Sequence, residues 1–324
     1  MLRTHRTLLR FGKRFHSAYD GTAYTGQFAE SYRKDIEPVK LAFEKHSSPG
    51  SQHDKPSIIF AHGLFGSKMN NRTVSKTLAS MLKRDVYCVD LRNHGDSPHN
   101  ERHDYPALSS DLELFVKDHK LEKPILIGHS MGAKAAMAFA LRNPTTPSAI
   151  ISVDNAPVDA SGGQSQFGKY VNCLQQIVSQ TGLNAIKTTK EADAKLSQVE
   201  PDIAVRQFLL TNLRRKSKCS NSEPGLYSKI GLDFIGKSLD SVAAFPFDPR
   251  ASTWSGPALF IRGDRSPFVS DEKLLACAAF FPRFEIKDVH DAGHWVISEK
   301  PQEFVRLVIE WINLLDDGSL EDLL

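Results

Sequence analysis

The feature that most constrains the fold is an alternation of short apolar runs with longer segments of helical periodicity. Residues 57–61 and 149–153 are apolar apart from one serine each and show no strict alternation, which is typical of strands that are buried on both faces. Residues 72–84 and 131–141 carry apolar side chains at helical spacing instead. Strands of this kind, separated by helices, predict a mostly parallel sheet with helices on both faces.

The same pattern continues on both sides of one interruption. Residues 161–247 are more polar and mostly helical in pattern, and they carry no strand signal. We therefore expect one α/β domain in two parts, 17–160 and 248–324, with residues 161–247 inserted as a helical lid. Further strands are predicted at 85–89, 124–127, 258–261 and 284–286, and further helices at 108–116 and 304–315.

Positive charge is concentrated at the amino terminus of a chain whose formal net charge is only +3. Residues 1–16 are basic, contain no acid and include leucine and phenylalanine, a composition typical of an amphipathic mitochondrial presequence. We predict a presequence over 1–16, cleavage near Ser17 and a mitochondrial location; a disordered basic tail is the alternative. The remaining chain is close to neutral, so nothing in it favours a nucleic-acid partner. The basic side chains are Arg3, Arg6, Arg10, Lys13 and Arg14.

The sequence lacks the long apolar runs of a membrane-spanning protein and the paired cysteines of a disulfide-stabilised or metal-binding protein. No apolar run is long enough to span a bilayer, so no transmembrane segment is expected. The four cysteines are scattered and form no CxxC pair, so neither structural disulfides nor a metal site is predicted. We interpret them as reduced thiols that mostly serve packing. They are Cys88, Cys173, Cys219 and Cys277.

The motif that carries the chemistry is Gly128-His129-Ser130-Met131-Gly132, which lies between a predicted strand and a predicted helix. A GxSxG sequence on a sharp strand-to-helix turn holds the serine Oγ clear of the backbone. Its glycines let two chain segments pass closely. This context predicts the α/β-hydrolase fold with Ser130 as nucleophile; a glycine-bearing turn with a buried serine is the alternative.

A glycine-containing loop follows the first predicted strand, at 61–66. In hydrolases of this fold such a loop donates one oxyanion N–H group, and the residue after the nucleophile donates the other. The predicted oxyanion donors are therefore the backbone N–H groups of Leu64 and Met131. We interpret His62 as a residue that holds the loop, without a part in proton transfer.

The predicted base is His294, in a segment that follows the last predicted strand. The fold uses the chain order serine, acid, histidine, whereas His94 precedes the nucleophile and is interpreted as part of a structural loop. Two aspartates end strands and are candidates for the acid, Asp154 and Asp264. Both strand ends lie at the carboxyl edge of the sheet, where the site forms, so topology alone leaves the choice open.

Several segments together resemble one subfamily, the mitochondrial abhydrolase-domain proteins that include the yeast ethanol acetyltransferases. The resemblance covers roughly residues 55–315. Its stretch within the insertion is specific, because lids vary widely between hydrolase families. The matching segments are 62–68, 93–99, 128–132, 205–213 and 293–295.

The resemblance bears on the choice of acid. In most α/β-hydrolases the acid comes a few residues after the glycine that ends the seventh strand, and this chain has Ser266 there. The subfamily places its acid after the sixth strand, in a segment similar to 153–157. It therefore implies Asp154 as the acid, with Ser130 and His294 as its partners. Ala133 stands where relatives commonly have a second glycine, a departure that is not expected to affect the chemistry.

The resemblance also implies acyl transfer through an acyl-enzyme. In the yeast members the donor is acetyl-CoA and the acceptor can be ethanol, which gives ethyl acetate. Water as acceptor gives thioesterase and esterase activity. Small esters, thioesters and alcohols are thus the expected partners, and acetyl-CoA enters as a substrate, with no cofactor implied.

Two alternative functions remain open. A mitochondrial carboxylesterase or lipase without alcohol acetyltransferase activity would use the same residues. A non-catalytic binding protein of this fold is less favoured, because such proteins often lose the nucleophile or the base. Ser130 excludes the aspartate-nucleophile mechanism of haloalkane dehalogenases and epoxide hydrolases. The basic run of Arg214, Arg215, Lys216 and Lys218 is interpreted as a solvated lid loop, with a contact to coenzyme A phosphates as the alternative.

Overall fold

The structure is a computed structural model that describes residues 36–51, 55–160, 165–216 and 225–320. The predicted presequence, 1–16, lies outside the described residues, as do Cys219 and Lys218. Within the described ranges no helix combines the length and the apolar character that crossing a bilayer requires.

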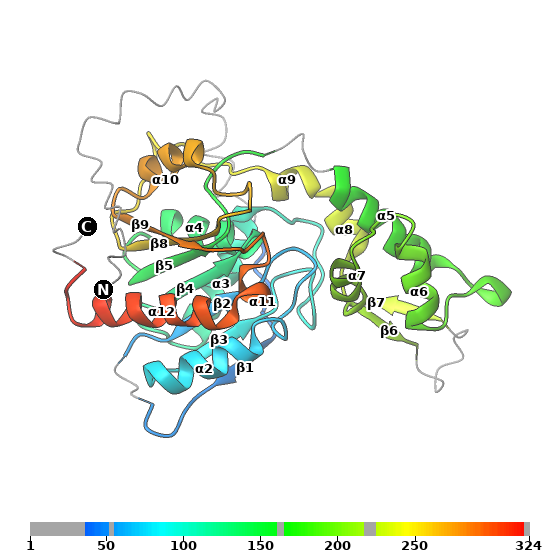
Figure 1. Ribbon diagram of the computed structural model, residues 1–324, viewed down its shortest axis with the longest axis horizontal. Coiled ribbons are helices and arrows are strands. Elements are labelled where there is room, and N and C mark those ends of the chain that lie inside the picture. Colours follow the sequence, from blue (N-terminus) through cyan, green and yellow to red (C-terminus); the bar gives the residue numbers. More distant parts are fainter. Residues whose placement is uncertain (1–35, 52–54, 161–164, 217–224, 321–324) are drawn as a thin grey trace.

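Seven strands form the central sheet in the order β1-β3-β2-β4-β5-β8-β9 (Figure 1). All neighbouring pairs are parallel except β1 and β3, which are antiparallel. The strands are β1 (Phe43–His46), β2 (Ile58–Ala61), β3 (Val86–Val89), β4 (Ile125–His129), β5 (Ala149–Val153), β8 (Ala258–Gly263) and β9 (Phe284–Val289). The predicted α/β-hydrolase fold, a mostly parallel sheet flanked by helices, is confirmed.

Helices cover both faces of this sheet, and consecutive strand residues bury their side chains on opposite faces. Ile59 packs into the cluster under α3, α4 and α10, whereas Phe60 packs into the cluster under α2 and α12. Each face therefore demands apolar residues, which explains the lack of alternation in the strand sequences. These helices are α2 (Arg72–Leu82), α3 (Tyr105–Asp118), α4 (Met131–Arg142), α10 (Leu274–Phe280) and α12 (Pro301–Asp316), with the short α11 (Val296–Glu299) before α12.

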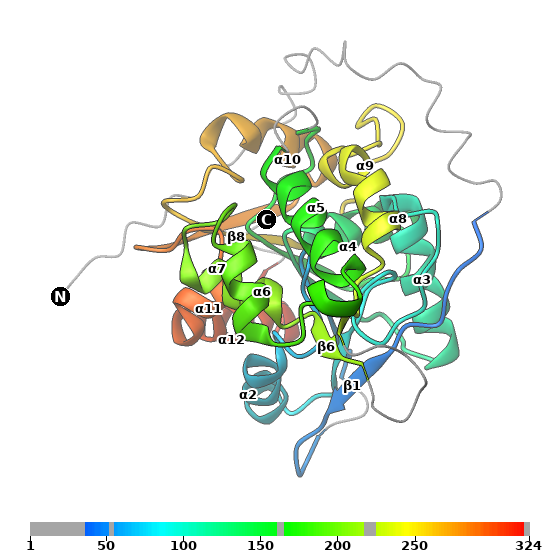
Figure 2. The ribbon, with the colours of Figure 1, turned by 90° about the vertical axis from the view of Figure 1, so that its right-hand side faces the viewer.

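The insertion leaves the core after β5 and returns before β8. It projects from one end of the core, at the right in Figure 1, and faces the viewer in Figure 2. Its elements are α5 (Ser165–Ser179), α6 (Thr189–Leu196), α7 (Ile203–Leu210), β6 (Leu213–Arg215), β7 (Leu226–Ser228), α8 (Leu232–Lys237) and α9 (Leu239–Ala243). We refer to residues 161–247 as the lid.

Two strand assignments differ from the prediction. The lid contains an antiparallel pair, β6 and β7, where the sequence predicted no strand. These strands are three residues long and bury only Leu213 and Leu226, too little for a periodic signal. The edge strand β1 was also not predicted, because its exposed and half-buried positions include Glu44 and Lys45.

Candidate active site

The predicted nucleophile lies on a strained turn between β4 and α4. Ser130 has φ 54° and ψ −116°, a backbone conformation that costs on the order of 1–3 kcal/mol and persists only where the surroundings enforce it. A Cβ atom at Gly128 would lie 2.1 Å from the Gly132 carbonyl oxygen, and one at Gly132 would lie 2.5 Å from that of Ala61. Both glycines are therefore required by close backbone approach.

The structure brings Ser130, His294 and Asp154 together in one hydrogen-bonded chain. The His294 Nε2 atom lies 3.0 Å from the Ser130 Oγ, and its Nδ1 atom lies 2.6 Å from the Asp154 Oδ2. The Asp154 side chain is fully buried and that of His294 is 17% exposed. This geometry suits proton transfer from the serine to an imidazole that is oriented by a carboxylate.

The Asp154 carboxylate is held by two donors, one from the last residue of β8 and one from the segment that follows it. The Ser266 hydroxyl donates to Oδ2 at 2.5 Å, and the Gly263 N–H donates to Oδ1 at 3.3 Å. Ser266 stands at the position where most hydrolases of this fold carry the acid. That strand end thus supports the aspartate of β5 by a hydrogen bond.

Asp264, the other candidate acid, points elsewhere. Its carboxylate pairs with His290 at 3.1 Å, and the His290 side chain is 89% exposed. This hydrogen bond lowers the pKa of Asp264. The two candidates that topology left open are therefore separated by the structure, which joins only Asp154 to His294.

Further contacts that the sequence analysis missed hold His294 in place. The Phe268 ring stacks on the imidazole with centroids 4.0 Å apart. The His129 Nε2 atom donates to the His294 backbone oxygen at 2.8 Å. His129 stands inside the GxSxG motif, which was a visible signal, whereas nothing in the sequence pointed to Phe268.

The loop after β2 approaches the nucleophile closely. A Cβ atom at Gly63 would lie 3.2 Å from the Ser130 Cβ. Leu64 borders the same cavity as Ser130, and Met131 begins α4, whose first N–H groups have no acceptor within the helix. Met131 thus follows the serine directly in sequence, and Leu64 lines the cavity beside it.

Two buried histidines hold the loop after β2 by hydrogen bonds to the backbone. The His94 Nε2 atom accepts the Phe65 N–H at 3.2 Å, and the His62 Nε2 atom accepts the Leu91 N–H at 3.0 Å. The His62 Nδ1 atom donates to the Gly63 oxygen at 2.8 Å. Both imidazoles therefore need to be neutral, in agreement with the structural roles expected for them.

Burial lowers the pKa of four histidines around the site from the ordinary value of 6.5. The pKa of His62 is lowered, and that of His94 lies well below its usual range. Burial, reinforced by the Arg92 charge, lowers the pKa of His103 to about 3. Burial and the neighbouring His294 lower that of His129 to about 4. The folded protein thus keeps His103 and His129 neutral in mild acid.

Acid is therefore expected to destabilise the fold below about pH 6.5. The unfolded chain binds protons there that the folded protein excludes, so His103 and His129 each lower the free energy of unfolding by up to about 1.4 kcal/mol per pH unit. The loss begins at 6.5 and continues down to the folded-state pKa of each group. Thermal unfolding from pH 7 to pH 5 measures it. His103→Gln should flatten the curve and the exposed-site control His290→Gln should not; identical slopes for all three proteins would contradict this explanation.

A small apolar cavity adjoins the Ser130 hydroxyl. Its volume is about 30 Å³, which is room for about two water molecules, since one water needs roughly 10–15 Å³ on this measure. The lid supplies one wall and the loop after β2 another. The lining side chains include Leu64 and Phe65 from the core and Phe167, Tyr170, Val205, Phe208 and Leu209 from the lid.

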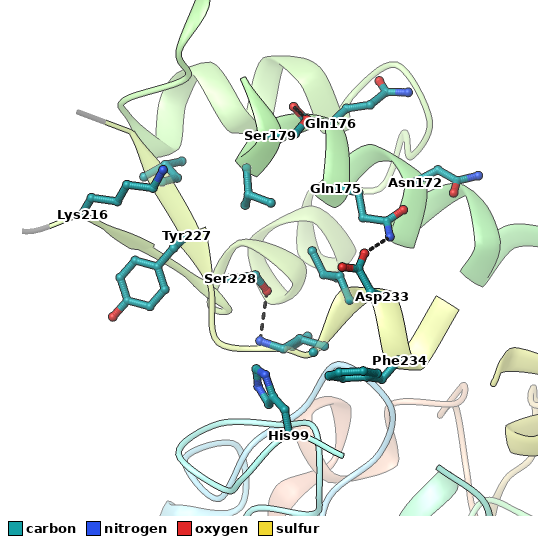
Figure 3. A pocket seen from close by; sticks show the side chains of 15 residues that line it. His99, Asn172, Gln175, Gln176, Ser179, Lys216, Tyr227, Ser228, Asp233 and Phe234 are labelled. Carbon is teal, nitrogen blue, oxygen red and sulfur yellow. Dashed lines mark hydrogen bonds between the residues drawn. The ribbon is translucent and has the colours of Figure 1, made fainter. Parts of the chain in front are cut away.

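A larger cavity of about 660 Å³ lies between α5, the β6–β7 pair and α8. Figure 3 shows its lining, with Lys216 and Tyr227 on one side, Gln175 and Asp233 on the other and His99 of the core below. It contains none of the predicted catalytic residues. Of the basic run, Arg214 and Arg215 are exposed on β6, and Lys216 borders this cavity.

The described side chains offer neither a metal site nor a reactive thiol. Among the described residues, no group of three or more histidine, cysteine or acidic side chains is arranged to hold a metal ion. The three described cysteines are buried free thiols. Burial raises the pKa of Cys88 to about 11, which disfavours its thiolate.

Comparison with known proteins points in the same direction. Residues 56–301 match the family model described as "alpha/beta hydrolase fold". The chain is 41% identical to a "Probable alcohol acetyltransferase" of Saccharomyces cerevisiae, over 81% of this chain and 79% of that protein. It is 35% identical to "sn-1-specific diacylglycerol lipase ABHD11" of Mus musculus, over 86% of this chain and 87% of the relative. A solved "Marine microorganism esterase" superposes with a TM-score of 0.74 at 30% identity, covering 84% of this chain and 99% of the esterase.

Proposed function

Because the chain belongs to the alpha/beta hydrolase family, in the abhydrolase-domain subfamily that includes yeast alcohol acetyltransferases, we propose that it transfers acyl groups through an acyl-enzyme on Ser130. Activity as an ester-acting hydrolase or acyltransferase follows from this membership. The observation that supports the finer proposal is the hydrogen-bonded chain from the Ser130 Oγ through His294 to the buried Asp154.

In the first half of the reaction Ser130 is acylated. The Ser130 Oγ attacks the thioester or ester carbonyl carbon while His294 Nε2 takes the hydroxyl proton. The Leu64 and Met131 N–H groups stabilise the oxyanion, and Asp154 stabilises the imidazolium that forms. The bond to the leaving sulfur or oxygen then breaks, and the leaving group receives the proton from His294.

In the second half an acceptor hydroxyl releases the acyl group. His294 takes the acceptor proton as its oxygen attacks the acyl-enzyme, and the Ser130 Oγ leaves with that proton. Ethanol as acceptor gives an ethyl ester, and water gives the free acid. One set of residues therefore serves transferase, thioesterase and esterase activities.

We propose acetyl-CoA as the acyl donor and ethanol as the acceptor, with ethyl acetate as the product. The support is the size and character of the cavity beside Ser130, which is apolar and about 30 Å³ in volume. An acetyl group has only one methyl beyond its carbonyl, so it suits a space of this size. A long acyl chain would require the lid wall at Phe167 and Tyr170 to move.

Rising ethanol is expected to divert the acyl-enzyme from water. Ethyl acetate should increase with ethanol while acetate falls in proportion, because both acceptors compete for the same Ser130 ester. The measurement uses acetyl-CoA at fixed concentration and scores ethyl acetate, acetate and free coenzyme A thiol. Absence of ethyl acetate at every ethanol concentration would remove the alcohol acetyltransferase proposal and leave the serine hydrolase intact.

The second candidate function is that of a carboxylesterase or lipase, and the mouse lipase and marine esterase relatives favour it. The same assay distinguishes it, since such an enzyme would release acid from esters without making ethyl acetate. A non-catalytic binding protein would fail a simpler test. A fluorophosphonate should label Ser130 covalently if His294 activates the hydroxyl.

We also propose that the protein acts in mitochondria, because residues 1–16 are basic, acid-free and interspersed with leucine and phenylalanine. Import is expected to remove the presequence near Ser17, with Arg14 three residues upstream of the cut. Mass spectrometry of the amino terminus of protein from intact cells measures this. Retention of Met1 on the bulk of the protein would argue against import by this route.

A further inference from the structure

Lys134 is a buried cation that the proposed mechanism does not use. It lies on α4 one helical turn after Ser130, and its backbone N–H donates to the Ser130 oxygen at 3.2 Å. The residue is only 2% exposed. Burial lowers the pKa of its ammonium group to about 7 against the opposing influence of the Asp159 carboxylate. A charge in this position needs compensating contacts.

Three backbone oxygens accept hydrogen bonds from the Lys134 ammonium. Its Nζ atom donates to Val158 at 2.8 Å, to Ala243 at 2.6 Å and to Ala244 at 3.1 Å. Three acceptors match the three hydrogens of the group. The buried charge is therefore fully hydrogen-bonded, and all three acceptors are main-chain oxygens.

The three acceptors come from the two ends of the lid. Val158 lies just before the lid begins, and Ala243 and Ala244 lie where α9 ends and the chain turns back to the core. We call these two segments, 158–160 and 242–244, the lid roots. They are more than eighty residues apart in sequence, yet one side chain on the nucleophile-bearing helix contacts both.

We propose that Lys134 is a positioning residue that clamps both lid roots to α4 and so keeps the lid wall seated over Ser130. The wall consists of Phe167, Tyr170 and the apolar side chains of α7 that line the small cavity. The part of this proposal that concerns substrate affinity rests on the proposed acyl-transfer function. The part that concerns the lid roots rests on geometry alone.

The neighbouring contacts supply a reporter and a matched control. The Ala160 N–H donates to the Ala243 oxygen at 3.1 Å, so this amide joins the two roots directly. The Tyr105 hydroxyl donates to the Val242 oxygen, in the return root, at 2.5 Å. Its ring, which Tyr105→Phe retains, has its centroid 5.6 Å from the Lys134 Nζ. Tyr105→Phe therefore removes one buried tie to the lid without releasing the other root.

Lys134→Met tests the clamp, because methionine keeps much of the side-chain volume and removes all three donors. Hydrogen exchange at the Ala160 amide is expected to accelerate about tenfold or more, since local opening of the roots costs less free energy. The KM for an acyl substrate should rise about tenfold with kcat nearly unchanged, the pattern of lost uniform binding. Tyr105→Phe should change both quantities by less than about threefold.

The rate of Ser130 labelling by a small fluorophosphonate separates a lid effect from damage to the site. Asp154 is held by Ser266 and Gly263, independently of Lys134, so labelling should stay within about threefold of the unmodified protein. If Lys134→Met fails to fold, Lys134→Gln keeps up to two donors and should give the same changes at smaller size.

Two outcomes would overturn the proposal. The first is that Lys134→Met leaves both the exchange rate of the Ala160 amide and the KM unchanged, which would show that the ammonium does not hold the lid roots. A fall in labelling rate and kcat with unchanged KM would show that Lys134 acts on the serine or its partners instead. Failure of the proposed function is distinguishable, because it would leave the unmodified protein inactive on acyl substrates while the exchange result still stands.

Discussion

Replacing Ser130 with alanine is expected to abolish thioester hydrolysis, ester hydrolysis and ethyl acetate synthesis together. The loss in kcat should be about 10⁶-fold, the scale observed when a serine protease loses its nucleophile. A residual rate about 10³-fold or more above the uncatalysed reaction is compatible with this, since oxyanion donors and binding remain. The three activities are measured on one preparation, with acetyl-CoA, a short-chain aryl ester and ethanol.

The shared loss is the informative part of this result. Within the described residues, one hydrogen-bonded chain of serine, histidine and aspartate borders the small cavity beside Ser130. Every acceptor therefore has to react through these three residues. If Ser130→Ala lost hydrolysis but kept ester synthesis, direct transfer between bound acetyl-CoA and ethanol, with His294 as base, would replace the acyl-enzyme. Circular dichroism and thermal unfolding of the variant control for misfolding.

Asp154→Asn should lower kcat by roughly 10⁴-fold, the effect of neutralising the acid of a serine protease. The carboxylate accepts from His294 Nδ1 at 2.6 Å, and an amide in its place favours the wrong tautomer and does not stabilise the imidazolium. Asp264→Asn is the matched control, because it makes the same chemical change at the end of the adjacent strand. It should cost less than about tenfold in kcat.

The comparison of these two variants is decisive because the same aspartate-to-asparagine change is made where the contacts and the burial differ. Asp264 pairs with the exposed His290, whereas Asp154 is fully buried beside His294. A larger loss in Asp264→Asn than in Asp154→Asn, with both proteins folded, would transfer the role of acid to Asp264. Measurement of kcat for ester hydrolysis by the two variants gives the contrast directly.

The core of the fold was predictable because burial on both faces leaves a strong mark on sequence. The central strands β2, β3, β4, β5 and β8 are buried along nearly their whole length, and each was found within a few residues of its bounds. The half-buried edge strand β9 was found from Phe284 and Ile286. The edge strand β1 pairs on one side only and includes Glu44 and Lys45, so it carries no such mark. The β6–β7 pair is too short for periodicity to be read from Leu213 and Leu226.

The candidate site was predictable where local sequence determines local geometry. The glycines around Ser130 are required by backbone contacts that the GxSxG spacing already implies. The choice between Asp154 and Asp264 depended on which strand end faces His294, a tertiary relation that no local pattern contains. Ser266, Phe268 and Lys134 act through partners more than twenty residues away in sequence, so their contacts became visible only in the folded chain.

The acyl-enzyme itself provides the most direct test of the central claim. The protein is mixed with acetyl-CoA in the absence of ethanol, quenched in acid within one turnover, digested and mapped by mass spectrometry. The account predicts a single acetyl group on the peptide that contains Ser130, present in the unmodified protein, absent from Ser130→Ala and discharged when ethanol is added before the quench. Turnover of acetyl-CoA without acetylation of that peptide, or with the acetyl group on another residue, would contradict it.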